Sequence, residues 1–517
     1  MSDSPSNPRK TLTIQTRKTH KAPVTAGDKH ESGRKKRSGG RARQVAIQER
    51  AHSQAPDAPE TLRHSAPPKD RPLRDRVQAP QGIGRASQPP QPRSQPETRP
   101  SARPNRKAKQ PSAQPDDGSA DPKPHITRRP REPRRAEIFS VFAPCPQGLE
   151  EALALELHAL GYEAVRQGRA GCHFQADWAG ILRANLYSRL ATRILVQVSQ
   201  AEVHTEDDIL ALAYETPWER WFGAEQTLRV DTSAVRSPLR SLQYCNLRAK
   251  DGICDRLRDR EGARPDIDTV RPDARVHLFL DARQATLYLD VSGESLFKRG
   301  WRLDKGEAPL RENLAAGLLA LSDWTPDQPL LDPFCGSGTI LIEAAWIALG
   351  VPAGIWRPFS FERLRNHDVR QWRDLKDDAR AHIAPRLEQP LVGCDLDPGA
   401  IAAARNNLER AHLTPDSIRL EIADARQFLP PASQGWIVTN PPYGERMGEA
   451  DSELWPQWAS HLKQHYMGWQ VNIITSDLDL PGRMRLKAHR RHPLHNGALD
   501  CRLFKFNMVA DSYRSSK

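Results

Sequence analysis

The first 135 residues of this chain lack phenylalanine, tryptophan, tyrosine and cysteine entirely, although the 517-residue sequence uses all four elsewhere. The same segment holds 21 of the 44 prolines. A stretch of this composition cannot bury enough apolar surface to offset the entropy that it would lose on ordering. We therefore expect residues 1–135 to form a disordered basic tail, rich in proline and arginine.

Other absences narrow the class of protein. No run of 18 apolar residues occurs, and the basic residues near the N-terminus are not followed by an apolar segment, so the sequence predicts neither a membrane span nor a secretory signal. The seven cysteines form no Cys-x-x-Cys pair and no zinc-like spacing. Scattered cysteines in an odd number are typical of a reducing compartment, so we expect a cytoplasmic protein without a metal site.

Positive charge is concentrated in the tail. Residues 1–135 carry 31 Lys and Arg against 13 Asp and Glu, whereas the remaining 382 residues carry 46 against 51. The net charge of +13 therefore comes from the tail, and the rest of the chain is mildly acidic. Such a tail either holds the protein near phosphate backbones or is a solvated extension, and composition does not separate the two.

Two α/β blocks follow the tail. The first, which we place at residues 136–195, begins with a short strand at 138–142 and an amphipathic helix at 147–162. Alternating apolar residues return at 171–174 and 194–198. Apolar residues at spacings of three to four, or of two, predict a helix or a strand with one buried face. The block contains no obvious catalytic residue, and we expect a small domain with its own core.

The second block, at residues 196–295, combines strands at 227–230, 276–280 and 285–289 with a long helix at 241–260. That helix repeats cationic side chains, which either contact a phosphate backbone or pair with acidic residues of the same helix. The cations are Arg248, Lys250, Arg256, Arg258 and Arg260, and the acids are Asp251, Asp255 and Asp259.

From residue 303 to 517 helices and strands alternate, which is typical of a doubly wound parallel sheet in an α/β fold. An apolar strand ends at Asp332 and leads through Phe334 into a turn with Gly336 and Gly338. Glycines there let the backbone approach a ligand closely. The turn has neither the Gly-x-Gly-x-x-Gly pattern of dinucleotide sites nor the lysine of a phosphate-binding loop. We expect Asp332, Phe334 and the two glycines to bind a different cofactor.

Carboxylates at strand ends indicate what that cofactor is. Asp332 would repel a phosphate but attract an ammonium group. The next strand ends at Asp395, which can accept hydrogen bonds from both ribose hydroxyls, with Asp397 as an alternative or as a helix cap. A third strand ends at Asp424, which can accept from an adenine amine. These side chains fit a ligand with an amino-acid end and an adenosine end.

The most specific motif is Asn440-Pro441-Pro442-Tyr443, a rigid turn after an apolar strand. An exocyclic amine has two protons, and two acceptors that hold them turn its lone pair toward an incoming group. The side-chain oxygen of Asn440 and the carbonyl of Pro441 can supply both acceptors. Tyr443 can stack on the base, which must be flipped or unpaired to enter the pocket.

These four motifs, in this order, resemble class I, Rossmann-like S-adenosylmethionine-dependent methyltransferases, and the Asn-Pro-Pro-Tyr turn marks members that modify base amines. The segments Leu296–Arg302 and Ala308–Ala315 resemble the domain junction in a family of bacterial large-subunit ribosomal RNA guanine-N2 methyltransferases, as does an Asn496-Gly497 hairpin. The resemblance implies a ferredoxin-like domain at 136–195, a THUMP RNA-binding domain at 196–295 and a methyltransferase domain at 303–517, without the second methyltransferase that some members carry.

The resemblance also implies the partners. It predicts S-adenosylmethionine as cofactor and RNA as substrate. Ribosomal RNA is the favoured substrate, and ribosomal precursor particles are a further partner. The oligomeric state stays open. The alternatives are an adenine-N6 methyltransferase acting on DNA or RNA, a transfer RNA guanine-N2 methyltransferase, and an assembly factor that keeps the cofactor fold without its chemistry. An intact Asn440 turn argues against the last.

Overall fold

The computed structural model describes residues 136–303, 310–442 and 453–509. The predicted tail and Tyr443 lie outside these ranges. Within them, no helix has both the length and the apolar character that crossing a membrane requires. All seven cysteines are buried and form no disulfide.

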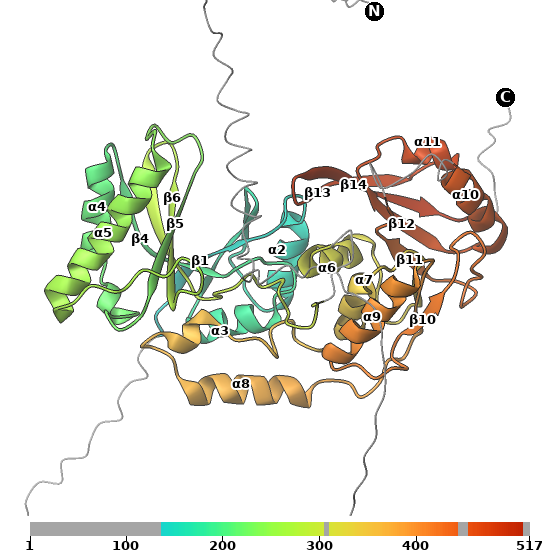
Figure 1. Cartoon of the computed structure of the whole chain (residues 1–517), viewed down its shortest axis with the longest axis horizontal. Helices are drawn as coiled ribbons and strands as arrows, with labels where there is room; N and C mark the ends of the chain where they lie inside the picture. Colours follow the sequence, from blue (N-terminus) through green and yellow to red (C-terminus); the bar gives the residue numbers. More distant parts are fainter. Residues whose placement is uncertain (1–135, 304–309, 443–452, 510–517) are drawn as a thin grey trace, which may run out of the picture. The chain divides into compact units, whose positions relative to one another are not determined.

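The two upstream blocks share one seven-stranded sheet with the order β2-β3-β1-β4-β7-β6-β5 (Figure 1). Strand β4 pairs with β1 on one side and with β7 on the other, so the predicted division at 195/196 falls at the first residue of a strand. The strands are β1 (Phe139–Pro144), β2 (Arg166–Gly168), β3 (Gly171–Ala176), β4 (Leu195–Glu202), β5 (Leu228–Ala234), β6 (Ala274–Leu280) and β7 (Gln284–Asp290).

Four longer helices accompany this sheet, namely α2 (Glu150–Ala159), α3 (Trp178–Tyr187), α4 (Glu206–Glu215) and α5 (Leu242–Glu261). The cations of α5 are mostly paired. Arg258 pairs with Asp255 and Asp259, and Lys250 with Asp251. Arg248 and Arg256 reach Asp207 and Glu219, which lie outside the helix. The ion-pair interpretation of this helix is therefore favoured over direct phosphate contact.

The second sheet has the order β10-β9-β8-β11-β12-β14-β13. Its first five strands are parallel, β14 runs antiparallel to β12, and β13 runs antiparallel to β14. The predicted doubly wound sheet is confirmed. The strands are β8 (Leu330–Asp332), β9 (Leu391–Asp395), β10 (Arg419–Ile422), β11 (Trp436–Thr439), β12 (Gln470–Thr475), β13 (Arg490–Asn496) and β14 (Leu499–Asn507). Gly497 has a φ of +65°, which suits the predicted hairpin turn.

Alternate residues of these strands enter two separate cores. Leu330 and Val438 pack into the core that also contains helices α6 (Glu312–Leu321), α7 (Thr339–Ala348) and α9 (Pro398–Arg410). Their neighbours Leu331 and Ile437 enter the core with α10 (Leu454–His465) and α11 (Leu480–Met484). A sheet covered on both faces requires apolar side chains in both directions. This explains why β8 and β11 are continuously apolar rather than alternating.

A buried ion pair lies at the junction predicted around Lys298 to Gly300. The Arg299 Nε lies 3.2 Å from an oxygen of Glu343 on α7, and both side chains are fully buried. Arg299 also donates to the carbonyls of Leu296 at 2.8 Å and Arg189 at 2.7 Å. A buried guanidinium requires this degree of pairing, because desolvation of an isolated charge is costly. The junction motif thus ties α7 to the upstream segment at Arg189.

Candidate active site

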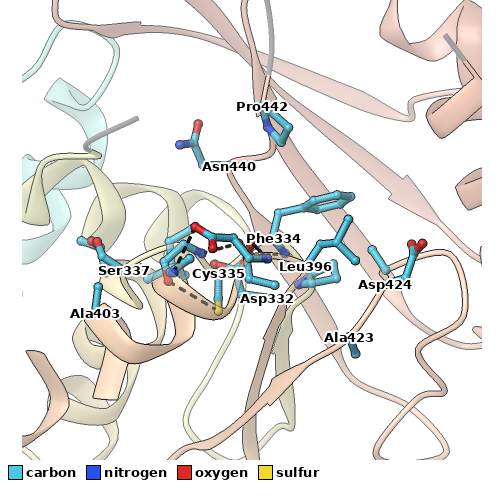
Figure 2. A pocket seen from close by; sticks show the side chains of 18 of the residues that line it. Asp332, Phe334, Cys335, Ser337, Leu396, Ala403, Ala423, Asp424, Asn440 and Pro442 are labelled. Carbon is cyan, nitrogen blue, oxygen red and sulfur yellow. Dashed lines mark hydrogen bonds between the residues drawn. The ribbon is translucent and has the colours of Figure 1, made fainter. Parts of the chain in front are cut away.

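A cavity of about 470 Å³ opens at the carboxyl ends of β8, β9 and β11 (Figure 2). Strand order reverses between β8 and β11, and ligands of open α/β sheets bind outside the carboxyl ends of the strands at such a reversal. The walls contain most of the residues predicted from the sequence, namely Asp332, Phe334, Gly336, Asp395, Asp397, Asp424, Asn440 and Pro442.

The glycine-rich turn forms the floor between β8 and α7. Gly336 has a φ of +51°, and a β-carbon at this position would meet no atom within 4 Å. The space beside its α-carbon is therefore open. Gly338 begins α7 with a φ of +79°, and a β-carbon there would lie 3.2 Å from the side chain of Ala404 on α9. Gly338 thus serves close helix packing, and it is not among the wall residues of the cavity.

Asp332 is buried at the tip of β8. One of its oxygens accepts hydrogen bonds from the Thr439 hydroxyl at 2.6 Å and from the Phe334 amide at 3.2 Å. Burial, with a smaller contribution from the negative charge of Asp395, raises the pKa of Asp332 to about 7. A cationic ligand beside Asp332 would favour its ionised form.

Asp395 and Asp397 take different roles. The Asp395 carboxylate accepts from the Gly336 amide at 2.9 Å and from the Asp397 amide at 3.0 Å, which fixes it across the turn from β8. Both oxygens of Asp397 cap α9, at 2.8 Å from the Gly399 amide and 3.2 Å from the Ala400 amide. Asp397 is thus the helix cap, and Asp395 is the better candidate for a ribose.

Asp424 has a partner that the sequence did not indicate. The Arg426 guanidinium donates to both of its oxygens, with the shortest distance 2.6 Å, and this contact lowers the pKa of Asp424. Arg426 also reaches Gln457 on α10 at 3.0 Å. Both Asp424 and Arg426 line the cavity, so an adenine amine at Asp424 would meet a carboxylate that is already ionised and oriented.

Asn440 is the first residue after β11. Figure 2 shows its side chain, with Pro442, on the side of the cavity away from Ala423. Among the described residues its Oδ1 is buried and has no hydrogen-bond partner. A buried acceptor without a partner costs free energy unless a ligand supplies the donor. Pro441 is buried and is not among the wall residues.

Three residues in or beside the cavity wall were missed by sequence reasoning, and two of them, Leu396 and Leu310, line the cavity. Thr439 links β11 to β8 through Asp332, and its signal was a polar residue at the end of an apolar strand. Leu396, 67% exposed although apolar, lies in the wall directly after Asp395. Leu310 also lines the cavity, and its carbonyl accepts from Arg302. No local signal in the sequence places Leu310 there.

Cys335 and Cys394 lie beside the turn, and a covalent methyl relay through either would require its thiolate. Burial raises the pKa of the Cys335 thiol well above its usual range and that of Cys394 to about 12. The thiolate is the nucleophilic form. Both residues therefore act as small apolar side chains, and Cys394 directs its thiol to the Pro333 carbonyl at 3.7 Å.

Three domain families match successive parts of the chain. The RlmL ferredoxin-like domain matches residues 140–195, the THUMP domain residues 203–290, and the RMKL-like methyltransferase domain residues 299–505. These matches confirm the three kinds of domain that the sequence predicted.

The names and descriptions of individual relatives agree with these domain matches. A protein named ribosomal RNA large subunit methyltransferase K/L from Syntrophotalea carbinolica is 40% identical over 388 residues, which is 72% of this chain and 54% of that protein. The chain spans about half the length of such curated relatives. A crystal structure described as a possible methylase from Clostridium difficile is 30% identical, with a TM-score of 0.67, and the match covers 73% of this chain and all of that one.

The crystal structure of SMU.472, described as a putative methyltransferase complexed with SAH, is 27% identical with a TM-score of 0.67. The match covers 72% of this chain and 99% of that chain. The chain therefore belongs to the family of methyltransferases in which an RlmL ferredoxin-like domain and a THUMP domain precede an RMKL-like methyltransferase domain.

Proposed function

We propose that this protein transfers a methyl group from S-adenosylmethionine to the exocyclic N2 amine of a guanosine in large-subunit ribosomal RNA. The observation that carries the proposal is the buried Oδ1 of Asn440, which has no hydrogen-bond partner among the residues that the structure describes and lies at a cavity also lined by Asp332, Asp395 and Asp424. A base amine would donate to the Asn440 oxygen, and a cationic, adenosine-bearing ligand would suit the carboxylates.

The residues present fit the cofactor. Asp332 would hold its ammonium group beside the open backbone of Gly336, Asp395 would accept the ribose hydroxyls, and Asp424 would accept from the adenine amine. Leu396 adds an exposed apolar side chain to the wall of the same cavity. When bound, S-adenosylmethionine supplies an electrophilic methyl group.

On the substrate side, Asn440 accepts one proton of the target amine and the Pro441 carbonyl the other, which turns the lone pair toward the methyl donor. Tyr443 would stack on the base. Asn440 cannot take up a proton, so the proton leaves to water after the nitrogen has been methylated and has become acidic. Positioning then provides most of the acceleration.

The proposal that the substrate is RNA rests on the domains before the methyltransferase domain and on the names of the relatives. The THUMP match at 203–290 and the names of the curated relatives support RNA, and ribosomal RNA in particular. We propose the cytoplasm as the site of action, with ribosomal precursor particles as a partner.

Cofactor binding should depend on pH through Asp332. With a carboxyl pKa of about 7, about one tenth of the protein is ionised at this residue at pH 6 and half at pH 7. The affinity for S-adenosylhomocysteine should therefore rise about fivefold between these values, because only the ionised form holds the ammonium group. Isothermal titration at both pH values measures the change. Asp332→Asn should bind more weakly and without this dependence, and a flat wild-type profile would contradict the assignment.

A genetic experiment tests the substrate. Deletion of the gene in the source organism should reduce N2-methylguanosine in digests of large-subunit ribosomal RNA, measured by mass spectrometry. The wild-type gene should restore it, and a gene encoding Asn440→Ala should not. An unchanged content of methylated nucleosides in ribosomal RNA would overturn the proposed substrate.

A further inference from the structure

A second cavity, of about 400 Å³, has a strongly basic wall that the proposed chemistry does not use. Its walls come from the segment before β6, from the linker that follows β7, from Arg193 and from residues 358–363. Five cations and one carboxylate line it. They are Arg193, Arg271, Arg275, Lys298, Arg363 and Glu294.

Three of the five cations have a carboxylate partner at 3.0 Å or less, and a fourth, Arg275, has a longer ion pair with Asp231 at 3.4 Å. Arg193 pairs with the buried Asp290 at 2.5 Å, and Arg363 pairs with Asp273 at 2.9 Å. Lys298 pairs with Glu294 at 3.0 Å, both largely exposed. These pairs fix the positions of three cations in the wall. Two guanidinium groups lack a carboxylate partner at such short distance.

Arg271 and Arg275 are those two groups. For the exposed Arg271, no ion pair or side-chain hydrogen bond is found within the described part of the chain. Arg275 is largely buried, with its Nε 3.4 Å from Asp231, and that Nε has no hydrogen-bond partner among the described residues. Desolvation, and next the charge of Arg193, lowers the pKa of Arg275. A bound anion would be stabilised here, because it would offset the repulsion between these cations and accept a hydrogen bond from the unpartnered donor.

We propose that this cavity binds a phosphodiester group of the RNA substrate, with Arg271 and Arg275 as its direct donors. The inference rests on the proposed function and adds a binding site to it. Arginine suits the role because its planar group donates two parallel hydrogen bonds to phosphate oxygens. Arg193 and Arg363 remain in their ion pairs and help to shape the wall.

The wall residues come from two domains, and this affects how the cavity would bind RNA. Arg271 and Arg275 belong to the segment matched by the THUMP family, whereas Arg363 belongs to the segment matched by the methyltransferase family. A phosphate held by Arg271 and Arg275 would therefore lie in a cavity lined by both segments. Such contacts set the register of a nucleic acid without reading its sequence, so the cavity would contribute to RNA affinity rather than to the choice of base.

The test compares wild-type full-length protein with Arg271→Ala and Arg275→Gln. Binding of unmodified large-subunit ribosomal RNA, transcribed in vitro, is measured by filter retention at several salt concentrations. Each variant should bind about fivefold more weakly at moderate salt, and the slope of log affinity against log salt should fall by about 0.7 to 0.9 for each lost phosphate contact. Arg373→Ala, an exposed arginine of α8 (Val369–Ala381) outside the cavity wall, removes the same charge and should change neither quantity.

Affinity for S-adenosylhomocysteine separates a lost contact from a damaged fold, and it should equal that of wild type in both variants. Wild-type RNA affinity and salt slope in Arg271→Ala would overturn the inference while leaving the proposed function intact. Failure of the wild-type protein to methylate any RNA would instead overturn the proposed function. Saturable binding of inorganic phosphate that is lost in Arg271→Ala, with RNA affinity unchanged, would mean a small-anion site and would also overturn the inference.

Discussion

Asn440→Ala should lower kcat by about a hundred- to a thousandfold, while the dissociation constant of S-adenosylmethionine stays within about twofold of wild type. The Asn440 Oδ1 is a buried acceptor that has no hydrogen-bond partner within the described ranges, and the carboxylates assigned to the cofactor are separate side chains. Removing Oδ1 therefore removes the orientation of the amine and leaves the cofactor contacts intact. Single-turnover methylation at saturating cofactor measures the first quantity, and isothermal titration measures the second.

The conservative variant Asn440→Asp is the matched control. It keeps an acceptor oxygen at the same place, so it should retain far more activity than Asn440→Ala, within about tenfold of wild type. Equal losses of turnover and of cofactor affinity in Asn440→Ala would show that Asn440 shapes the cofactor site rather than orienting the base.

Arg299→Met should lower the free energy of unfolding by about 3 to 5 kcal/mol, because it leaves the Glu343 carboxylate buried without its main partner. Arg189 lies 3.7 Å from the same carboxylate and compensates only in part. The variant also leaves the carbonyl of Leu296 without this donor. Urea denaturation followed by tryptophan fluorescence measures the loss, because Trp301 near Arg299 and Trp346 near Glu343 are both buried and lie 6.2 Å apart between ring centroids.

A double variant separates the lost pair from lost packing. Arg299→Met combined with Glu343→Leu removes both charges, and it should be more stable than Arg299→Met alone. The exposed Arg373→Ala should stay within about 0.5 kcal/mol of wild type. A double variant that is less stable than the single one would show that Arg299 acts through packing and not through its charge.

Much of the methyltransferase region could be predicted because its signals are local. Strand ends marked by Asp332 and Asp395, the turn at Gly336 and the helix cap at Asp397 each depend on a few neighbouring residues. The cap of α4 was equally visible, since Thr205 and Asp208 form a capping box, but that helix was not predicted.

Contacts between distant segments could not be predicted. The hydrogen bond from Thr439 to Asp332 and the ion pair of Arg299 with Glu343 join residues 107 and 44 positions apart. The pairing of β4 with both β1 and β7 depends on which strand edges meet, and apolar alternation does not encode that choice. The Lys298-Arg299-Gly300 motif was recognised as a junction, but only the structure shows the buried charge behind it.

The measurement that tests the central claim most directly is methylation in vitro with labelled S-adenosylmethionine. Purified protein is incubated with separate pools of unmodified ribosomal RNA, transfer RNA and duplex DNA, and the labelled nucleoside is identified after digestion. The account predicts N2-methylguanosine, and it predicts it in large-subunit ribosomal RNA. Label found only as N6-methyladenosine in DNA would contradict the account.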